Sequence, residues 1–432
     1  MHGPSLLAAV IAFRGATLVD GTGAPPIPNS LLVVDGGRIA SVGVATPEAT
    51  ANLPPGTQVV AEDGKWIVPG LIDAHVHAES DADLRTMLHW GITSVRLMAE
   101  DTADAVALAR ASCARADVPE VFPAAPIFTV KGGWWDQGQP PDRNLNRFPA
   151  TPEEARASVR TAKALGSREI KVMLDDMAWC RAPRPTLAKV PRPVLEALVG
   201  EARAQGMRAI VHAPNLEDAK TAVAVGATAL AHGVLEPLDD GTIAAMKARH
   251  IFYVPTMDIF EFLAGPRASL DAVLGIAGRA GPTDIERWLE PATLARLRSR
   301  EYSDHYRTGY PNLEYVSRHL PVLRGNLSTL KAAEVPVAMG TDMWAYPGLA
   351  ASVEMELYVQ AGLTPMEAIR SATEIAARSI EASDRGTLER GRRADLLVLD
   401  ADPLRDVRNV RRIAEIWKGG SRVGPTGERR GP

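Results

Sequence analysis

The chain has 432 residues, of which 46% are hydrophobic and 23% charged, enough for one large barrel and a smaller domain. Its formal net charge of -4 gives no sign of the basic face that a nucleic-acid partner usually needs, so no such partner is expected. Two cysteines, Cys113 and Cys180, exclude a disulfide framework and favour a reducing cytoplasm.

The first 70 residues are predicted to form β-structure without a helix. The apolar run from Ser5 to Phe13 lacks a positively charged start and is too short for a membrane span, so neither a signal peptide nor a membrane segment is expected. Five short apolar or alternating runs follow, and Asp-Gly turns separate several of them. These runs are Phe13–Val19, Leu31–Val34, Arg38–Val42, Gln58–Val60 and Trp66–Val68.

From residue 71 onward, strand-like apolar runs alternate with helix-like stretches. Thr151-Pro152-Glu153-Glu154 and Thr364-Pro365-Met366-Glu367 are typical of helix starts. Strand–helix alternation repeated eight times predicts an α/β protein with a closed (β/α)8, or TIM, barrel. The predicted strands are Leu71–His77, Thr93–Met98, Val121–Thr129, Glu169–Leu174, Arg208–His212, Ala229–His232, Phe252–Met257 and Val337–Asp342.

Two parts of the chain depart from this alternation. The polar stretch Phe260–Leu320 either lies over the barrel mouth as a lid or pocket wall, or forms ordinary outer helices, and both interpretations stay open. Near Gly386 β-structure returns, with strands expected over Ala394–Leu399 and Ile413–Trp417. Both chain ends are therefore expected to build one small β-sandwich, giving domains of 1–70 plus 381–432 around a barrel of 71–380.

His75 and His77 are the strongest local signal for a metal site. They stand two residues apart at the end of the first barrel strand, where such side chains point to the same side, and imidazole suits zinc and similar metals. Each further candidate alone has an ordinary explanation, such as a bond to a loop or a helix cap. Together they predict a metal centre, because the chain has only nine histidines and four lie at strand ends where barrels do chemistry. The further candidates are Lys171, His212, His232 and Asp342.

Lys171 lies inside an apolar strand, which is an expensive place for a cation unless the side chain snorkels out at an edge. Burial would lower its pKa and leave more neutral amine. A neutral amine can add carbon dioxide and become a carbamate, which resembles a carboxylate and could bridge two cations.

The ordered set His75-x-His77, Lys171, His212, His232 and Asp342 resembles the amidohydrolase superfamily. The likeness covers nearly the whole chain, with Phe260–Leu320 the poorest part, and is strongest to imidazolonepropionase-like enzymes and metal-dependent Xaa-Pro and Xaa-Arg dipeptidases. Similar flanking segments are Val68-Pro69-Gly70-Leu71-Ile72-Asp73-Ala74-His75, Gly340-Thr341-Asp342, Thr364-Pro365-Met366-Glu367-Ala368, Gly386-Thr387-Leu388 and Ala394-Asp395-Leu396.

The resemblance implies two divalent metal ions, zinc in our expectation, although such ligands also accept cobalt, manganese or iron. His75, His77 and Asp342 would bind the more buried ion, His212 and His232 the second, and carboxylated Lys171 would bridge them. Asp342 and His232 would be the catalytic residues, with Asp342 passing the water's proton to the leaving nitrogen. A cytoplasmic homo-oligomer acting on a small-molecule substrate is expected, with no membrane partner.

The implied function is hydrolysis of an amide-type C–N bond in an amide, peptide, carbamate or urea by metal-activated hydroxide. One alternative is a related metal-dependent hydrolase acting as a deaminase, cyclic amidase or lactonase. Another is a non-catalytic barrel kept as a structural or interaction module, which would require ligand losses that the sequence does not show.

One run departs from the dipeptidase-like pattern of Gly-Gly-His after the third strand. Here the sequence is Lys131-Gly132-Gly133-Trp134-Trp135. The two tryptophans put peptide substrates in doubt and suggest a flat aromatic ligand, unless the rings only pack under a loop. Five residues on predicted mouth loops could hold a substrate carboxylate or be ordinary surface: Lys131, Arg181, Arg184, Tyr302 and Tyr306.

Overall fold

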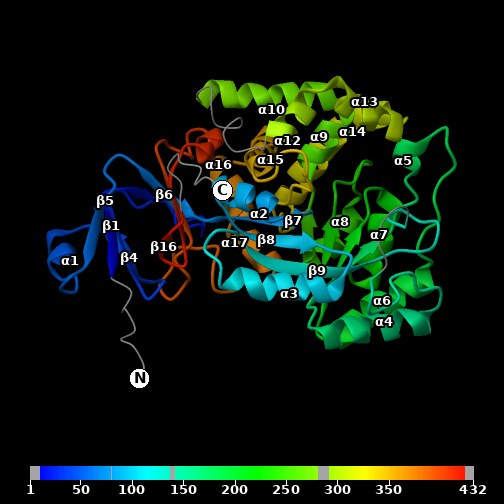
Figure 1. Ribbon diagram of the computed structural model, residues 1–432, viewed down its shortest axis with the longest axis horizontal. Helices are drawn as coiled ribbons and strands as arrows, with labels where there is room; N and C mark the ends of the chain where they lie inside the picture. The colour runs from blue at the N-terminus through cyan, green and yellow to red at the C-terminus, as the bar shows by residue number, and fades with distance from the viewer. Residues whose placement is uncertain (1–9, 79, 137–141, 281–290, 424–432) are drawn as a thin grey trace.

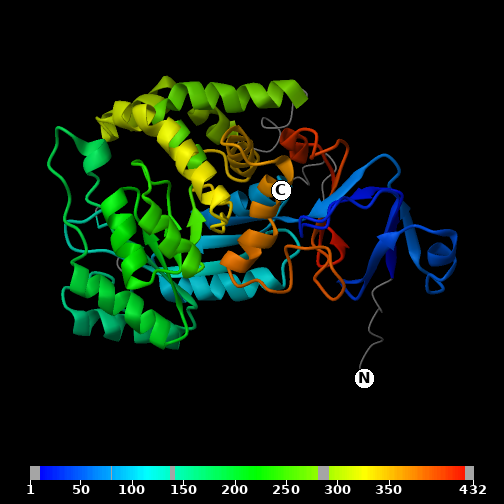
Figure 2. The same cartoon turned by 180° about the vertical axis from the view of Figure 1, so that it is seen from behind.

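The computed structural model describes residues 10–78, 80–136, 142–280 and 291–423. Residues 1–9 and 424–432 of the predicted small domain, which include the start of the Ser5 run, and residues 281–290 of the predicted insertion lie outside this description. Figure 1 shows a large body of strands and helices with a smaller β-structure at one end, and Figure 2 shows the same arrangement from behind.

The barrel sheet has seven regular parallel strands. They are β7 (Leu71–Val76), β8 (Ile92–Met98), β9 (Glu120–Phe128), β10 (Glu169–Met173), β11 (Arg208–His212), β12 (Ala229–Ala231) and β13 (Phe252–Val254), paired in chain order. Segment 336–342 fills the eighth position. The Ala338 amide donates to the Tyr253 carbonyl on β13, and the Ala74 amide on β7 donates to the Met339 carbonyl, both at 2.9 Å. The predicted (β/α)8 barrel is therefore confirmed.

Gly340 allows this closing segment to approach β7. A Cβ at position 340 would lie 2.5 Å from Cγ1 of Val254 and 2.9 Å from Cβ of His75, closer than packed atoms tolerate. A larger residue would push the segment away from the strand that carries His75. The glycine therefore sets the spacing between two parts of the predicted site.

Helices cover the outside of the barrel. They are α2 (Asp81–His89), α3 (Thr102–Cys113), α4 (Pro152–Leu165), α6 (Arg192–Ala204), α7 (Leu216–Val225), α8 (Asp240–Ala248), α15 (Leu349–Gln360), α16 (Pro365–Ser371) and α17 (Glu374–Ser379). The short helix α5 (Ala178–Arg181) instead lies on the connection that follows β10. The predicted helix starts are confirmed, because the side chains of Thr151 and Thr364 cap α4 and α16. None of the described helices is long and apolar enough to cross a lipid bilayer.

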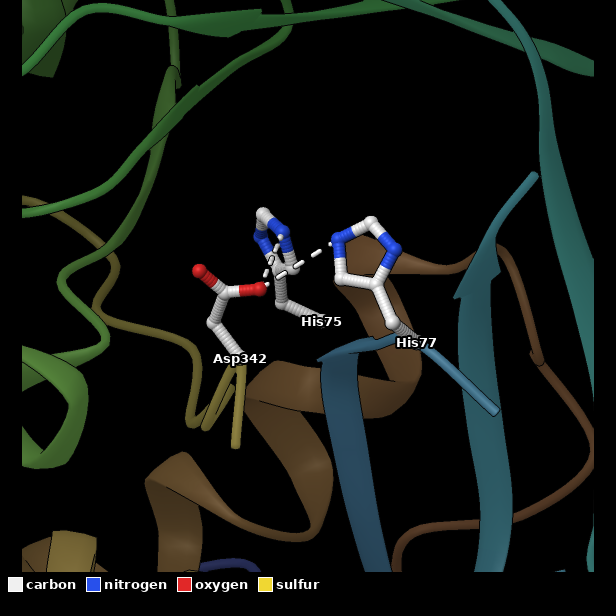
Figure 3. Close-up of side chains that lie close together, drawn as sticks. All are labelled: His75, His77 and Asp342. Atoms are coloured by element: carbon white, nitrogen blue, oxygen red, sulfur yellow. Dashed lines mark ion pairs between the residues drawn. The ribbon is translucent and has the colours of Figure 1, made fainter. Parts of the chain in front are cut away.

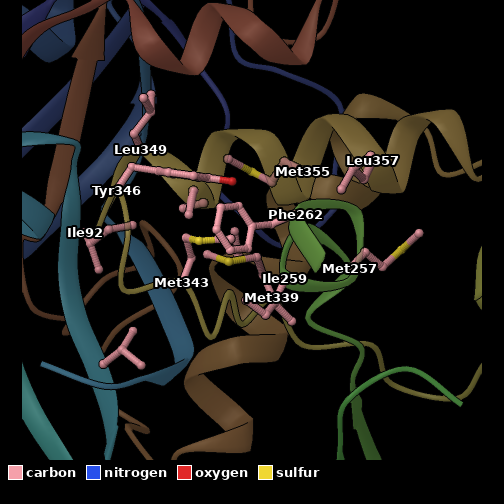
Figure 4. Packing of buried hydrophobic residues seen from close by; sticks show 14 of the residues in the cluster. Ile92, Met257, Ile259, Phe262, Met339, Met343, Tyr346, Leu349, Met355 and Leu357 are labelled. Carbon is pink, nitrogen blue, oxygen red and sulfur yellow. The ribbon is translucent and has the colours of Figure 1, made fainter. Parts of the chain in front are cut away.

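The insertion after β13 is helical. Its described helices are α9 (Met257–Ala264), α10 (Pro266–Ala280), α12 (Pro291–Arg298), α13 (Arg300–Gly309) and α14 (Leu313–Ala332). The predicted seventh strand ends early, at Val254, because Met257 already begins α9. Both carboxylate oxygens of Glu354 on α15 accept amides at the start of α9, at 2.8 and 2.7 Å. Figure 4 shows Phe262 of α9 among buried side chains of α15 and the segment before it.

The small β-sandwich is built from both chain ends, as predicted. One sheet has the order β4-β3-β1-β5 and the other β16-β15-β14-β6-β2. Phe13, Leu32, Val398 and Trp417 pack in the core that the two sheets share. The strands are β1 (Ile11–Arg14), β2 (Thr17–Leu18), β3 (Ser30–Asp35), β4 (Arg38–Val44), β5 (Gln58–Ala61), β6 (Trp66–Pro69), β14 (Leu396–Leu399), β15 (Ile413–Lys418) and β16 (Ser421–Arg422), with a 3-10 helix η1 (Val407–Arg411) before β15. The domain boundaries themselves stay predictions.

The prediction that the first 70 residues contain no helix is wrong. A short helix, α1 (Pro47–Ala51), lies between β4 and β5, and the Thr46 side chain accepts the Ala49 amide at its start. The helix buries none of its residues, so no apolar stripe marks it in the sequence. In the sequence, this helix is marked by the threonine–proline pair at its beginning, which is a helix-start signal.

Candidate metal centre

The six predicted site residues line one cavity of about 400 Å³ at the carboxyl ends of the barrel strands. They come from β7 and the residue after it, from β10 and β11, from the residue after β12, and from the closing segment. In sequence order they are His75, His77, Lys171, His212, His232 and Asp342. In a closed barrel the carboxyl ends of the strands surround one opening, so side chains that are far apart in the sequence come together there.

His75, His77 and Asp342 form the tightest group (Figure 3). Nε2 of His77 lies 3.3 Å from Oδ1 of Asp342, and Nε2 of His75 lies 3.6 Å from the same oxygen. One potential ligand atom from each residue lies within 4.8 Å of the other two. Burial, with help from the charge of Lys171, lowers the pKa of His75 well below its usual value. Its imidazole is therefore neutral and can bind a metal.

Lys171 lies next to this group. Its Nζ is 3.5 Å from Nε2 of His75, and the residue is 2% exposed, which rules out a snorkelling edge lysine. Burial lowers the pKa of Lys171 to about 7, so roughly half of the amine is neutral near pH 7. The side chain thus has the neutral amine and the position that carbamate formation needs.

His212 and His232 lie on the other side of Asp342. Their ring centroids are 4.3 Å apart, and Nδ1 of His232 is 3.6 Å from Oδ2 of Asp342. Burial, with the charge of His212 as the second cause, lowers the pKa of His232 well below its usual value. The two oxygens of Asp342 therefore face different histidines, Oδ1 towards His75 and His77 and Oδ2 towards His232.

Asp175 is a neighbour of the site that was not predicted from the sequence. Its Oδ2 lies 3.0 Å from Nε2 of His212 and also accepts the indole N–H of Trp179 at 2.9 Å. Nδ1 of His212 is buried and has no hydrogen-bond partner among the described residues. A carboxylate that holds one imidazole nitrogen leaves the other for a metal, as in carboxylate–histidine–metal arrangements. The orphaned nitrogen shows that these residues fit a metal ion.

Asp175→Asn is expected to weaken metal binding through His212 about 10- to 100-fold, because an amide no longer fixes the tautomer of His212 as a carboxylate does. A chelator competition with the metal-loaded protein measures the change. The matched control is Asp176→Asn, since Asp176 is the next residue but bonds the amide of Ala178. Wild-type metal affinity in Asp175→Asn would contradict the positioning role.

Hydrogen bonds to Asp73 connect the closing segment to β7 beside the site. Its carboxylate accepts the His75 amide at 3.1 Å and the hydroxyl and amide of Thr341 at 2.7 and 3.0 Å. Burial raises the pKa of Asp73 to about 7, although these bonds oppose the rise. Asp73 belongs to the motif that precedes His75 but was not among the predicted site residues.

Two site residues have left-handed backbone conformations. His232 has a φ of 76° and Asp342 a φ of 54°, which costs roughly 1 kcal/mol or more each. Hydrogen bonds compensate, because the His232 amide donates to Val254 at 2.9 Å and the Asp342 amide to His75 at 2.8 Å. Such strain is characteristic of functional sites, where it aims a side chain that a relaxed backbone would point elsewhere.

Trp134 and Trp135 both line the cavity, and the Trp135 ring centroid is 5.2 Å from that of His77. Packing only under a loop is therefore excluded. The insertion contributes Phe260 and Tyr310 to the lining, so part of it is a pocket wall.

The five residues suggested as carboxylate holders are absent from the cavity lining. Their side chains are engaged elsewhere: Lys131 pairs with Asp136, Arg181 and Arg184 donate to backbone carbonyls, and Tyr306 and Tyr302 bond each other. That suggestion is wrong.

Comparisons with known proteins agree with this geometry. A family model described as "Amidohydrolase family" matches residues 66–423. Ochratoxinase of Aspergillus niger is 28% identical over 288 residues, which cover 64% of this chain and 51% of that relative, so the match spans about half of its length. Imidazolonepropionase of Deinococcus radiodurans is 25% identical over 423 residues, 92% of each chain. The fold is shared with a putative prolidase from Bifidobacterium longum, at a TM-score of 0.76 and 24% identity over 98% of this chain and 97% of that one.

Proposed function

Because the chain belongs to the amidohydrolase family, as its ordered motifs predicted, we propose that it hydrolyses an amide-type C–N bond at a binuclear metal centre. The bond would belong to an amide, peptide, carbamate or urea. The observation that carries this proposal is the convergence of four histidines, a lysine and an aspartate on one cavity.

Two zinc ions fit the nitrogen and oxygen ligands described above. His75, His77 and Asp342 would hold one ion, His212 and His232 the other, and carboxylated Lys171 would bridge them. When bound, such ions supply Lewis acidity, which lowers the pKa of water and polarises a carbonyl oxygen.

The protein side chains supply the proton transfer and the positioning. Asp342 accepts the proton of the attacking water and returns it to the leaving nitrogen. Nδ1 of His232 is held 3.0 Å from the Thr256 hydroxyl, which fixes the ring and leaves its Nε2 for a metal ion. The aromatic walls around Trp135 exclude bulk water and bind the flat parts of the substrate.

Metal removal and restoration test the proposal. Chelated protein is expected to be inactive, and two equivalents of zinc, cobalt or manganese per chain are expected to restore hydrolysis of members of a panel of amides, peptides, carbamates and ureas. The same panel includes lactones and aminopurines, since activity on these alone would favour the lactonase or deaminase alternative. A chain that binds no metal and turns over no substrate would contradict an enzymatic role.

A further inference from the structure

The walls of the cavity beyond the six predicted ligands are mostly apolar and aromatic. Among the described residues that line it, Lys171 is the one lysine or arginine, and a carbamate on Lys171 would remove that positive charge. Apart from the ligands, the lining consists of Ala78, Met98, Glu100, Ile127, Trp134, Trp135, Met173, Met177, Trp179, Pro214, Ile259, Phe260, Leu263, Tyr310 and Trp344. A flat apolar group suits such walls.

Most of the hydrogen-bond donors in these walls already donate to acceptors within the protein. The indole N–H of Trp135 donates to Glu100 at 2.8 Å, and that of Trp179 to Asp175 at 2.9 Å. The indole N–H of Trp344 donates to the Tyr306 hydroxyl at 2.7 Å. A substrate carboxylate in the cavity would therefore find these three donors occupied and no positive side chain outside the metal ligands. The indole of Trp134 and the hydroxyl of Tyr310 also line the cavity and could offset only part of the cost of its desolvation.

Glu100 adds a negative charge to the wall. It follows β8, lines the cavity, and uses Oε1 to bind the indole of Trp135, whose ring lies beside His77. The buried Arg147 lies behind this wall, where it donates to the carbonyls of Ile127 and Trp135 at 3.1 Å and does not line the cavity. The positive charge of Arg147 interacts with that of Glu100 and offsets part of it, but Glu100 alone of the two lines the cavity, so the nearer charge is negative.

We propose that the cavity selects uncharged aromatic amides, carbamates or ureas, and that Glu100 is the residue that discriminates against substrates with a carboxylate. This inference rests on the proposed function and names the substrate class of the same site. Like charges brought together in a poorly solvated cavity repel each other strongly enough to decide between two otherwise identical substrates.

A pair of substrates that differ by one carboxylate, acetanilide and 4-acetamidobenzoate, tests the inference. The metal-loaded wild type is expected to show a kcat/KM at least about 100-fold higher for acetanilide. Glu100→Gln keeps an acceptor oxygen for the indole of Trp135 but removes the charge, and is expected to reduce that ratio about tenfold. A general loss of wall structure would lower kcat/KM for both substrates alike. A change in the ratio of the two kcat/KM values therefore reports charge discrimination.

The matched control is Glu261→Gln. Glu261 lies on α9, the helix that contributes Phe260 to the wall, but its side chain pairs with Arg324 and does not line the cavity. The same change in net charge there is expected to leave the ratio unchanged. An equal ratio in wild type and Glu100→Gln, or a wild type that hydrolyses 4-acetamidobenzoate as well as acetanilide, would overturn the inference.

Calorimetric binding of the same two compounds distinguishes this inference from the proposed function. A protein that hydrolyses no member of the substrate panel but binds acetanilide more tightly, with a smaller preference in Glu100→Gln, supports the selectivity while the proposed hydrolysis fails. Equal hydrolysis of both compounds overturns the selectivity while the proposed hydrolysis stands. Equal binding of both compounds by a protein that hydrolyses no member of the panel overturns both.

Discussion

Asp342→Asn is expected to lower turnover by about a thousandfold or more while the protein stays folded. The amide cannot accept a proton and is a weaker metal ligand than the carboxylate that faces His75, His77 and His232. Asparagine tolerates the left-handed backbone at position 342 as well as aspartate does, so the closing segment keeps its course. The measurements are kcat at saturating metal and the thermal unfolding of the metal-free protein.

A buried aspartate outside the cavity provides the control. Burial raises the pKa of Asp258 at the start of α9 to about 8, so its carboxyl group is largely protonated at neutral pH. Asp258→Asn therefore removes little charge and is expected to keep turnover within several-fold of wild type. Near-normal turnover of Asp342→Asn at saturating metal would rule out the proton-transfer role of Asp342.

Lys171→Ala is expected to reduce the metal content from two ions per chain towards one and to lower turnover by a similar factor of about a thousand. The variant removes the amine that would carry the carbamate beside His75. Added acetate or propionate is expected to restore part of both properties, because a short carboxylate can enter the vacated space and supply the missing oxygens. Metal analysis and kcat on the same samples measure the effect.

Lys171→Arg tests whether position 171 needs a carbamate or only a positive charge. The guanidinium keeps a cation at position 171 but does not add carbon dioxide, and it fills the space that acetate would need. This variant is expected to be inactive with or without acetate. Full turnover and two bound ions in Lys171→Ala without added carboxylate would contradict the bridging role proposed for Lys171.

Much of the fold and the six candidate ligands could be predicted from local sequence, because strand–helix alternation and strand-end histidines are local patterns. Asp175 and Glu100 could not be assigned in this way. Each is held by a partner on another element, Asp175 by His212 on β11 and Glu100 by Trp135 on the loop after β9, and side-chain partners are fixed by tertiary packing. For the same reason, the sequence could not predict where Arg181 and the other residues suggested to bind a substrate carboxylate point. A loop residue can face either the barrel mouth or the solvent.

The pairing of β6 with β14 has a consequence for biosynthesis. In a nascent chain, β1 to β6 leave the ribosome early, whereas the antiparallel partner of β6 is translated near the end. The barrel likewise stays open until segment 336–342 emerges to join β7. Strands with unsatisfied edges are therefore exposed for most of translation, a period in which chaperones and slow, cool expression protect against aggregation.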